Sequence, residues 1–207
     1  EKQVVRFAYA KALITAPVLI ALKKGFFAEE GLEIVITGEF SSGKESFETM
    51  LANKADLSTP ATTPVVANSF KSKDFSIFVT YLTTYDGIKV VARRDRGISN
   101  PFDLTGKHIG IVKGTISQIL IDTLLAYNKV FLNEVSMSAF KGLDLPTALQ
   151  NGDVDAISVW EPYANQALER MPGVAVQIPS QRVYRIAINM AVMNRFAEKN
   201  PEALIKV

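Results

Sequence analysis

The 207-residue sequence contains no cysteine, which excludes disulfide frameworks, thiolate metal sites and cysteine nucleophiles. It contains one histidine, His108, in an apolar run that is typical of a buried strand. There is no metal-ligand spacing, no Gly-x-Ser-x-Gly sequence and no Walker-type loop. We therefore expect a protein that is not an enzyme, with no catalytic residues, no metal and no cofactor.

Long apolar runs and an excess of one charge are also missing. No segment approaches the roughly 20 apolar residues that span a bilayer, and the opening Glu1-Lys2-Gln3 has no signal-peptide pattern. This fits a cytoplasmic protein or an exported one whose leader has been removed. The 23 basic and 21 acidic residues give a formal charge of +2 with no basic block, which argues against a nucleic-acid partner.

What the sequence does contain is a repeated pattern. Residues 149–163 predict a helix end, an Asn-Gly turn, a short buried strand at 156–159 and a helix that opens at Pro162. Trp160 and Glu161 are expected in the gap between that strand and that helix. In open α/β sheets, ligands bind at such strand ends.

An earlier segment, residues 51–64, repeats the pattern, with Asn53 matching Asn151 and Asp56 matching Asp155 after a one-residue insertion. Residues 4–24 and 107–127 likewise each predict a strand, a polar loop and a helix. The alternation of strands and helices along the whole chain predicts an α/β protein with mostly parallel sheets. We predict two similar lobes, at 1–92 and 93–182, with a return strand and the start of a C-terminal helix at 183–207 that belong to the first lobe.

Three segments carry a family resemblance. Residues 24–34, KGFFAEEGLEI, closely resemble a signature of solute-binding proteins of the alkanesulfonate, taurine and nitrate type, a group that includes binders of a thiamine pyrimidine precursor. Residues 104–115 and 151–163 resemble two further signatures of that group. The resemblance implies a type II periplasmic binding fold, in which two α/β lobes hold one ligand in a cleft. Family members continue through further helices, so we expect the C-terminal end of the first lobe to be cut short here, in a fragment, a naturally short form or the sensor portion of a signalling protein.

In the second lobe, the candidate ligand contacts are Gly114, Thr115 and Ser117. They open a helix after a strand, where free N–H groups and the helix dipole favour a small anion. The alternative is an ordinary N-cap.

In the first lobe, the equivalent turn holds Thr59 and Pro60, with a capping loop as the alternative. Tyr9 and Lys11 follow the first strand, and Lys11 is either a point charge for an anion or a solvated loop residue. Ser42 and Gly43 occupy another strand-to-helix turn, for which a capping role is favoured.

Aromatic and acidic residues complete the predicted site. Trp160, Tyr81 and Tyr85 are candidate walls of the cleft. Asp86 and Glu161 would suit an amine or aminopyrimidine, although Glu161 equally suits the first turn of a helix. Asn189 is expected to offer an amide from the return strand.

These observations favour a substrate-binding component of an ABC importer that delivers a small organic anion, such as a sulfonate or nitrate, to a membrane permease. We expect a monomer in the periplasm or outside the cell, with or without a lipid anchor. The alternatives are a ligand-sensing domain of a signalling protein and a binder of a thiamine pyrimidine precursor. An enzyme of pyrimidine synthesis is disfavoured, because the resemblance implies His and Cys residues that this chain lacks.

Overall fold

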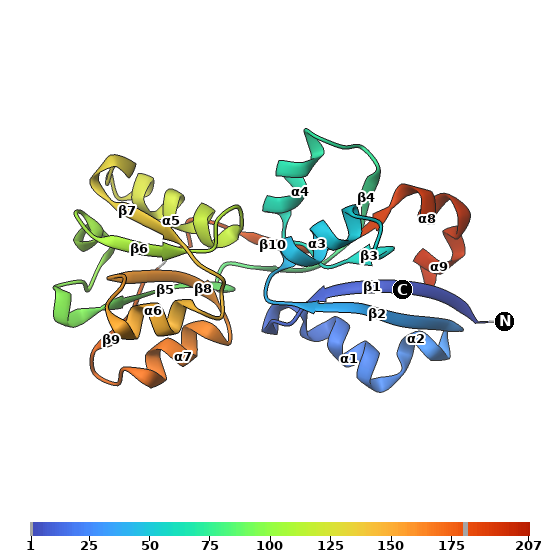
Figure 1. Cartoon of the computed structure of the whole chain (residues 1–207), viewed down its shortest axis with the longest axis horizontal. Coiled ribbons are helices and arrows are strands. Elements are labelled where there is room, and N and C mark those ends of the chain that lie inside the picture. Colours follow the sequence, from blue (N-terminus) through green and yellow to red (C-terminus); the bar gives the residue numbers. More distant parts are fainter. Residues whose placement is uncertain (1, 180–181) are drawn as a thin grey trace. The chain divides into compact units, whose positions relative to one another are not determined.

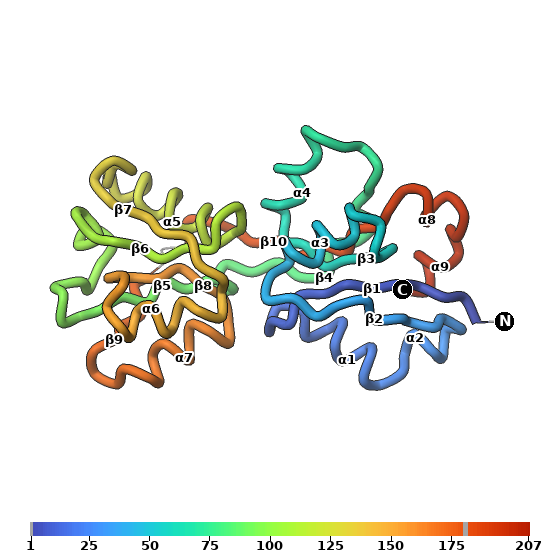
Figure 2. Tube along the Cα trace, viewed as in Figure 1, coloured from blue at the N-terminus to red at the C-terminus, as the bar shows by residue number. Residues whose placement is uncertain are grey.

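The computed structural model describes residues 2–179 and 182–207, and its chain divides into two compact units. Unit 1 comprises the chain up to Thr83 together with Ala187–Val207, and unit 2 comprises Thr84–Ile186. The chain therefore passes from unit 1 to unit 2 once and returns once, as can be followed in Figure 2.

The first boundary between the units differs from the predicted one at residue 92. Strand β5 (Ile88–Arg93) lies in unit 2, because it pairs antiparallel with β8 (Ala156–Trp160) on one side and with β9 (Ala175–Ile178) on the other. The return strand β10 (Ile186–Met193) joins the sheet of unit 1.

Unit 1 is built on a five-stranded sheet in the order β2-β1-β3-β10-β4. Its other strands are β1 (Gln3–Ala10), β2 (Leu32–Phe40), β3 (Leu57–Ser58) and β4 (Phe75–Thr84). Its helices are η1 (Leu13–Thr15), α1 (Ala16–Lys24), α2 (Phe26–Glu29), α3 (Gly43–Leu51), α4 (Thr62–Ser69), α8 (Asn194–Lys199) and α9 (Pro201–Lys206). Figure 1 shows α1 and α2 on one face of the sheet and α3 on the other.

Unit 2 is built on a second five-stranded sheet, in the order β7-β6-β8-β5-β9. Its remaining strands are β6 (His108–Ile111) and β7 (Ser136–Ala139). Its helices are η2 (Arg94–Arg96), η3 (Pro101–Leu104), α5 (Ile116–Tyr127), η4 (Leu132–Glu134), α6 (Leu145–Asn151) and α7 (Tyr163–Arg170). In Figure 1, α5 covers one face of this sheet, and α6 and α7 cover the other.

The two sheets have the same strand order when β1, β2, β3, β10 and β4 are matched with β6, β7, β8, β5 and β9. In unit 1, β1 runs parallel to β2 and β3, and β10 runs antiparallel to β3. In unit 2, β6 runs parallel to β7 and β8, and β5 runs antiparallel to β8. The predicted α/β class with two similar lobes is confirmed. The sheets are more mixed than predicted because the strands that cross between the units enter in the opposite direction.

Local sequence explains where the principal helices begin and end. Ser42 precedes α3 and accepts a hydrogen bond from the amide of Glu45, and Thr115 precedes α5 and accepts one from the amide of Ser117. Gly25 and Gly152 follow α1 and α6 at φ values of 80° and 82°, which glycine adopts at little cost.

Each unit has its own apolar core. In unit 1, fully buried side chains from β1, α3 and β3 pack together: Phe7, Phe47, Met50 and Leu57. In unit 2, the fully buried side chains come mainly from β6, α5 and β8: Ile109, Leu120, Ile121, Leu124 and Ile157. Burial of these apolar surfaces is the main driving force for folding of each unit.

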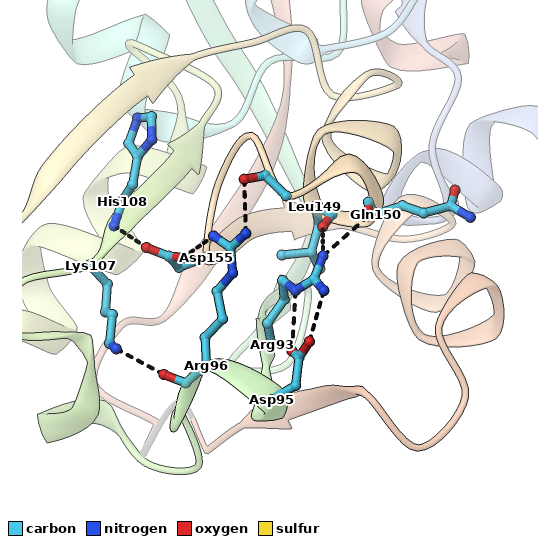
Figure 3. Close-up of polar contacts among 9 residues, drawn as sticks. Arg93, Asp95, Arg96, Lys107, His108, Leu149, Gln150 and Asp155 are labelled. Atoms are coloured by element: carbon cyan, nitrogen blue, oxygen red, sulfur yellow. Dashed lines mark hydrogen bonds and ion pairs between the residues drawn. The ribbon is translucent and has the colours of Figure 1, made fainter.

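A network of charged residues ties the segments of unit 2 together at the amino ends of β6 and β8 (Figure 3). Asp155 accepts a hydrogen bond from the amide of His108 at 2.8 Å and forms an ion pair with Arg96. Arg93 pairs with Asp95 at 2.8 Å and also donates to the carbonyl oxygens of Leu149 and Gln150, in the last turn of α6. These contacts connect the crossing segment after β5 to the rest of unit 2.

Candidate functional site

The candidate residues gather mainly at the carboxyl ends of the parallel strands, which is where α/β sheets bind ligands. In unit 1 these are the turns after β1, β2 and β3, and in unit 2 they are the turns after β6 and β8.

Tyr9 and Lys11 of unit 1 share one partner, Glu39. Tyr9 stands opposite Glu39 in the β1–β2 register and donates its hydroxyl proton to Glu39 Oε1, and Lys11 Nζ lies 3.0 Å from Glu39 Oε2. Burial, reinforced by the Glu39 hydrogen bond, raises the pKa of Tyr9 to about 12, and the donors Tyr9 and Lys11 lower the pKa of the Glu39 carboxyl. Lys11 is therefore half of an exposed ion pair, and its side chain stays accessible to solvent.

The turn after β2 holds Ser42 and Gly43 in supporting positions. Ser42 is buried and caps α3 through the amide of Glu45 at 3.2 Å, which is the role that the sequence favoured for it. A Cβ on Gly43 would lie 2.8 Å from the carbonyl oxygen of Thr59, so only glycine lets the turns after β2 and β3 approach this closely.

The turn after β3 is held by hydrogen bonds from two other strands. Thr59 is buried and its Oγ1 accepts the amide proton of Ala10 at 3.0 Å, while the carbonyl oxygen of Pro60 accepts the amide of Asn189 at 2.9 Å. The side-chain oxygen of Asn189 accepts a proton from Thr80 at 2.7 Å. Asn189 thus anchors β10 to this turn, and its amide group is engaged within unit 1.

Tyr81, on β4, is a further candidate, and unit 1 partly buries it. Burial raises the pKa of its hydroxyl, an effect that the nearby Thr15 hydroxyl partly offsets. Tyr81 also borders an apolar groove of about 410 Å³ that includes Val18 of α1 and Leu204 of α9. Its ring is therefore part of the packing between β4 and the helices.

In unit 2, the turn before α5 uses its hydroxyl protons internally. Thr115 donates to the carbonyl oxygen of Val112 at 2.7 Å, and Ser117 donates to the carbonyl oxygen of Ser158 at 2.6 Å. The amide of Gly114 donates to the side-chain oxygen of Gln118 at 3.0 Å. Neither hydroxyl has a proton left for an anion, so these bonds favour the N-cap interpretation of Thr115 and a structural role for Ser117.

Trp160 and Glu161 were both predicted to lie between the strand and the following helix, and only Glu161 does. Trp160 is the last residue of β8, pairs with Ile88 and is 3% exposed. Glu161 lies beyond the strand, and its Oε2 accepts the amide proton of Asn165 at 3.0 Å. It precedes α7, whose first residue is Tyr163, and does not stand in the first turn that the sequence favoured for it. The strand extends one residue further than predicted because an aromatic side chain suits a strand as well as a loop.

Tyr85 and Asp86 lie in the crossing segment at the start of unit 2. The guanidinium of Arg182 stands 4.7 Å from the centre of the Tyr85 ring, a cation–π contact. The amide of Asp86 donates to Thr84 Oγ1 at 3.0 Å. Tyr85 is thus placed against a cation of its own unit.

Residues 2–179 and 182–207 contain no group of three or more His, Asp or Glu side chains that could hold a metal ion. Within the same residues, no helix combines the length and apolarity needed to cross a membrane.

Glu39 contacts two predicted site residues, Tyr9 and Lys11, but was not itself predicted from the sequence. Its position opposite Tyr9 depends on a register shift between Phe7 and Ala8, and a bulge of this kind leaves no clear pattern in the sequence. The structure brings together Tyr9 with Lys11, and Gly43 with Thr59, Pro60 and Asn189.

Comparison with known proteins gives relatives of two kinds. A Bacillus subtilis protein named as an aliphatic sulfonates-binding protein is 28% identical over 199 residues, which are 92% of this chain and 58% of that protein. A 4-amino-5-hydroxymethyl-2-methylpyrimidine phosphate synthase of Aspergillus parasiticus is 30% identical over 143 residues, which are 68% of this chain and 40% of that protein. The chain thus spans about 58% or less of the length of these curated relatives.

Solved structures agree with the fold. The alkanesulfonate-binding protein SsuA of Xanthomonas axonopodis pv. citri, bound to MOPS, matches with a TM-score of 0.82 at 18% identity, over 100% of this chain and 71% of that one. The two α/β units thus have the fold of periplasmic binding proteins. Residues 14–207 match the family described as NMT1/THI5 like. Because the match covers most of the chain, the chain belongs to that family.

Proposed function

We propose that this chain is the solute-binding component of an ABC importer and that it binds a small organic anion such as a sulfonate or nitrate. The observation that carries the proposal is the repeated sheet, in which both units present strand-end turns built from buried hydroxyl groups and backbone amides. The similarity to a protein named as a sulfonate binder supports the ligand class.

The roles of the candidate residues follow from their hydrogen bonds. Thr59, Asn189, Thr115 and Ser117 shape the turns, because their polar groups already have partners within their own unit. Lys11 and the backbone near Gly114 are the proposed contacts for the anion. Lys11 Nζ has three protons, and the Glu39 contact uses one of them.

We propose further that the protein is a non-catalytic monomer that acts outside the cytoplasmic membrane and passes its ligand to a permease. The similarity to solute-binding proteins supports this location and this partner. The proposal requires binding without chemical change, so a bound solute should be recovered unaltered.

A second candidate function is binding of a thiamine pyrimidine precursor. The 30% identity to a pyrimidine phosphate synthase favours it. Glu39, an exposed carboxylate at a strand end, would accept protons from an exocyclic amine.

A thermal-shift screen of the purified chain separates these functions. The panel contains taurine, alkanesulfonates, nitrate, bicarbonate, aromatic carboxylates and aminopyrimidines. A ligand at ~100 times its dissociation constant should add about 2.7 kcal/mol of stability. We expect the shift with a sulfonate or another anion. A shift with aminopyrimidines alone supports the second function, and no shift in a cooperatively melting protein contradicts both.

A further inference from the structure

Trp160 has a buried donor with no acceptor. The side chain is 3% exposed, and its Nε1 proton meets no hydrogen-bond acceptor within residues 2–179 and 182–207. A buried donor left without a partner costs stability that a purely apolar ring would not. Packing alone therefore does not account for an indole at this position.

The neighbouring turn shows which way the N–H edge of the indole faces. A Cβ on Gly142 would lie 3.2 Å from Trp160 Cζ2 and 3.4 Å from a ring carbon of Tyr163. Cζ2 is bonded to the same ring carbon as Nε1, so the N–H edge lies on the side of the turn at residues 141–144. That turn is closed by a hydrogen bond of 3.0 Å from the amide of Asp144 to the carbonyl oxygen of Lys141, and the Lys141 side chain is exposed.

The matching position in unit 1 shows that the backbone does not require this side chain. Phe7 pairs with Leu57 in unit 1 as Ile109 pairs with Ala156 in unit 2, so Leu57 and Ala156 occupy equivalent positions. Ala61 lies four residues after Leu57, as Trp160 lies four residues after Ala156, and is therefore the counterpart of Trp160. Ala61 forms a bridge with Ile188, as Trp160 pairs with Ile88. The same strand end is thus formed with a methyl group in one unit and an indole in the other.

We propose that Trp160 Nε1 donates a hydrogen bond to an oxygen of the ligand's anionic group, in a subsite of unit 2 bounded by the end of β8 and the turn at 141–144. This inference rests on the proposed function and names the residue that selects an oxyanion. The indole N–H is a donor only, so it can meet an acceptor but no other donor. An ammonium group has no lone pair to accept the proton and is rejected there.

The sequence provides a direct probe, because Trp160 is its single tryptophan and gives one indole signal in a 15N–1H correlation spectrum. We would titrate the whole chain with ethanesulfonate, nitrate, benzoate and ethylammonium. A bound oxyanion should move the indole proton downfield in a saturable manner, and ethylammonium should not. An indole signal that stays in place while backbone amides shift saturably overturns the inference and leaves the proposed function standing.

A substitution that removes only the donor completes the test. Replacing Trp160 by 3-benzothienylalanine puts sulfur where the N–H stands and retains the ring shape. It should weaken binding of the oxyanion about tenfold or more, as expected for a hydrogen bond to a charged group. Trp160→Phe should weaken binding as well, and Tyr127→Phe, which alters an exposed ring, should not.

Two outcomes contradict the inference in different ways. If the benzothienyl variant binds the oxyanion with unchanged affinity, and melts at or above the temperature of the original chain, the proposed role of Trp160 is overturned and the proposed function still stands. Failure of the unmodified chain to bind any probe in the panel overturns the proposed function and this inference with it.

Discussion

In unit 1 the amide of Asp56 donates to the carbonyl oxygen of Arg6 at 2.8 Å, and in unit 2 the amide of Asp155 donates to that of His108 at 2.7 Å. In each unit the carboxylate accepts the amide of the same strand residue in return, at 3.0 Å and 2.8 Å. The carbonyl oxygen of each aspartate also accepts an amide from a crossing strand, that of Met193 or Arg93. The two units therefore share a backbone frame at the level of single hydrogen bonds.

The side chains on this frame differ. In unit 1, Arg6 pairs with Asp56 from within β1, whereas in unit 2 the cation is Arg96, which follows the crossing strand β5. At the strand ends, the pair Tyr9 and Glu39 of unit 1 corresponds to Ile111 and Ala139 of unit 2. Backbone hydrogen bonds thus maintain the same frame in both units, whereas the side chains at the strand ends differ between them.

The largest effect should come from removing the aspartate of the shared frame. Asp56→Ala deletes three hydrogen bonds from Arg6 and leaves its guanidinium without its carboxylate, which should cost about 3 kcal/mol of unfolding free energy. Urea unfolding at pH 7 measures it, with the exposed Asp153→Ala as the control. A loss of less than about 0.5 kcal/mol would show that the frame does not depend on this residue.

A smaller effect on the unfolding free energy should come from removing the hydroxyl groups at the two strand ends, and the two losses should differ. The amide of Ala10 is bonded by Thr59 in unit 1, and that of Val112 is bonded by Ser117 in unit 2, at 3.0 Å and 2.9 Å. Ser117→Ala also loses the bond to Ser158 and should cost about 2 kcal/mol, whereas Thr59→Val should cost about 1 kcal/mol. Equal losses in urea unfolding would contradict this account.

The smallest effect concerns pH. Burial tends to raise the pKa of Asp155, but the amide of His108 and the charge of Arg96 prevail and lower it. A carboxyl with a lowered folded-state pKa contributes stability above its unfolded pKa and loses it as pH falls through the folded value. Since Arg96 is partly exposed, the contribution should be about 1 kcal/mol or less.

Asp155→Asn should therefore reduce the decline of stability below about pH 4, measured by urea unfolding from pH 7 to pH 3. The same replacement at the exposed Asp153 should leave the decline unchanged. A decline as steep in Asp155→Asn as in the unmodified chain would contradict the assignment.

Much of this frame could be predicted from the sequence, and some of the site could not. The match of Asp56 to Asp155 is confirmed by their identical backbone hydrogen bonds, because turn residues and short apolar runs leave a local pattern. The ion pair of Lys11 with Glu39 depends on the register of two strands across a bulge, which is a property of the folded sheet. The bond from Ser117 to the carbonyl oxygen of Ser158 likewise depends on how α5 packs against β8.

The most direct test of the central claim, that both units contribute strand-end turns to ligand binding, is hydrogen exchange measured with and without the first ligand found in the screen. We predict slower exchange in the segment 58–62 of unit 1 and in the segment 112–118 of unit 2 in the same sample. Protection confined to one unit, or absent from both segments at saturating ligand, would contradict the claim.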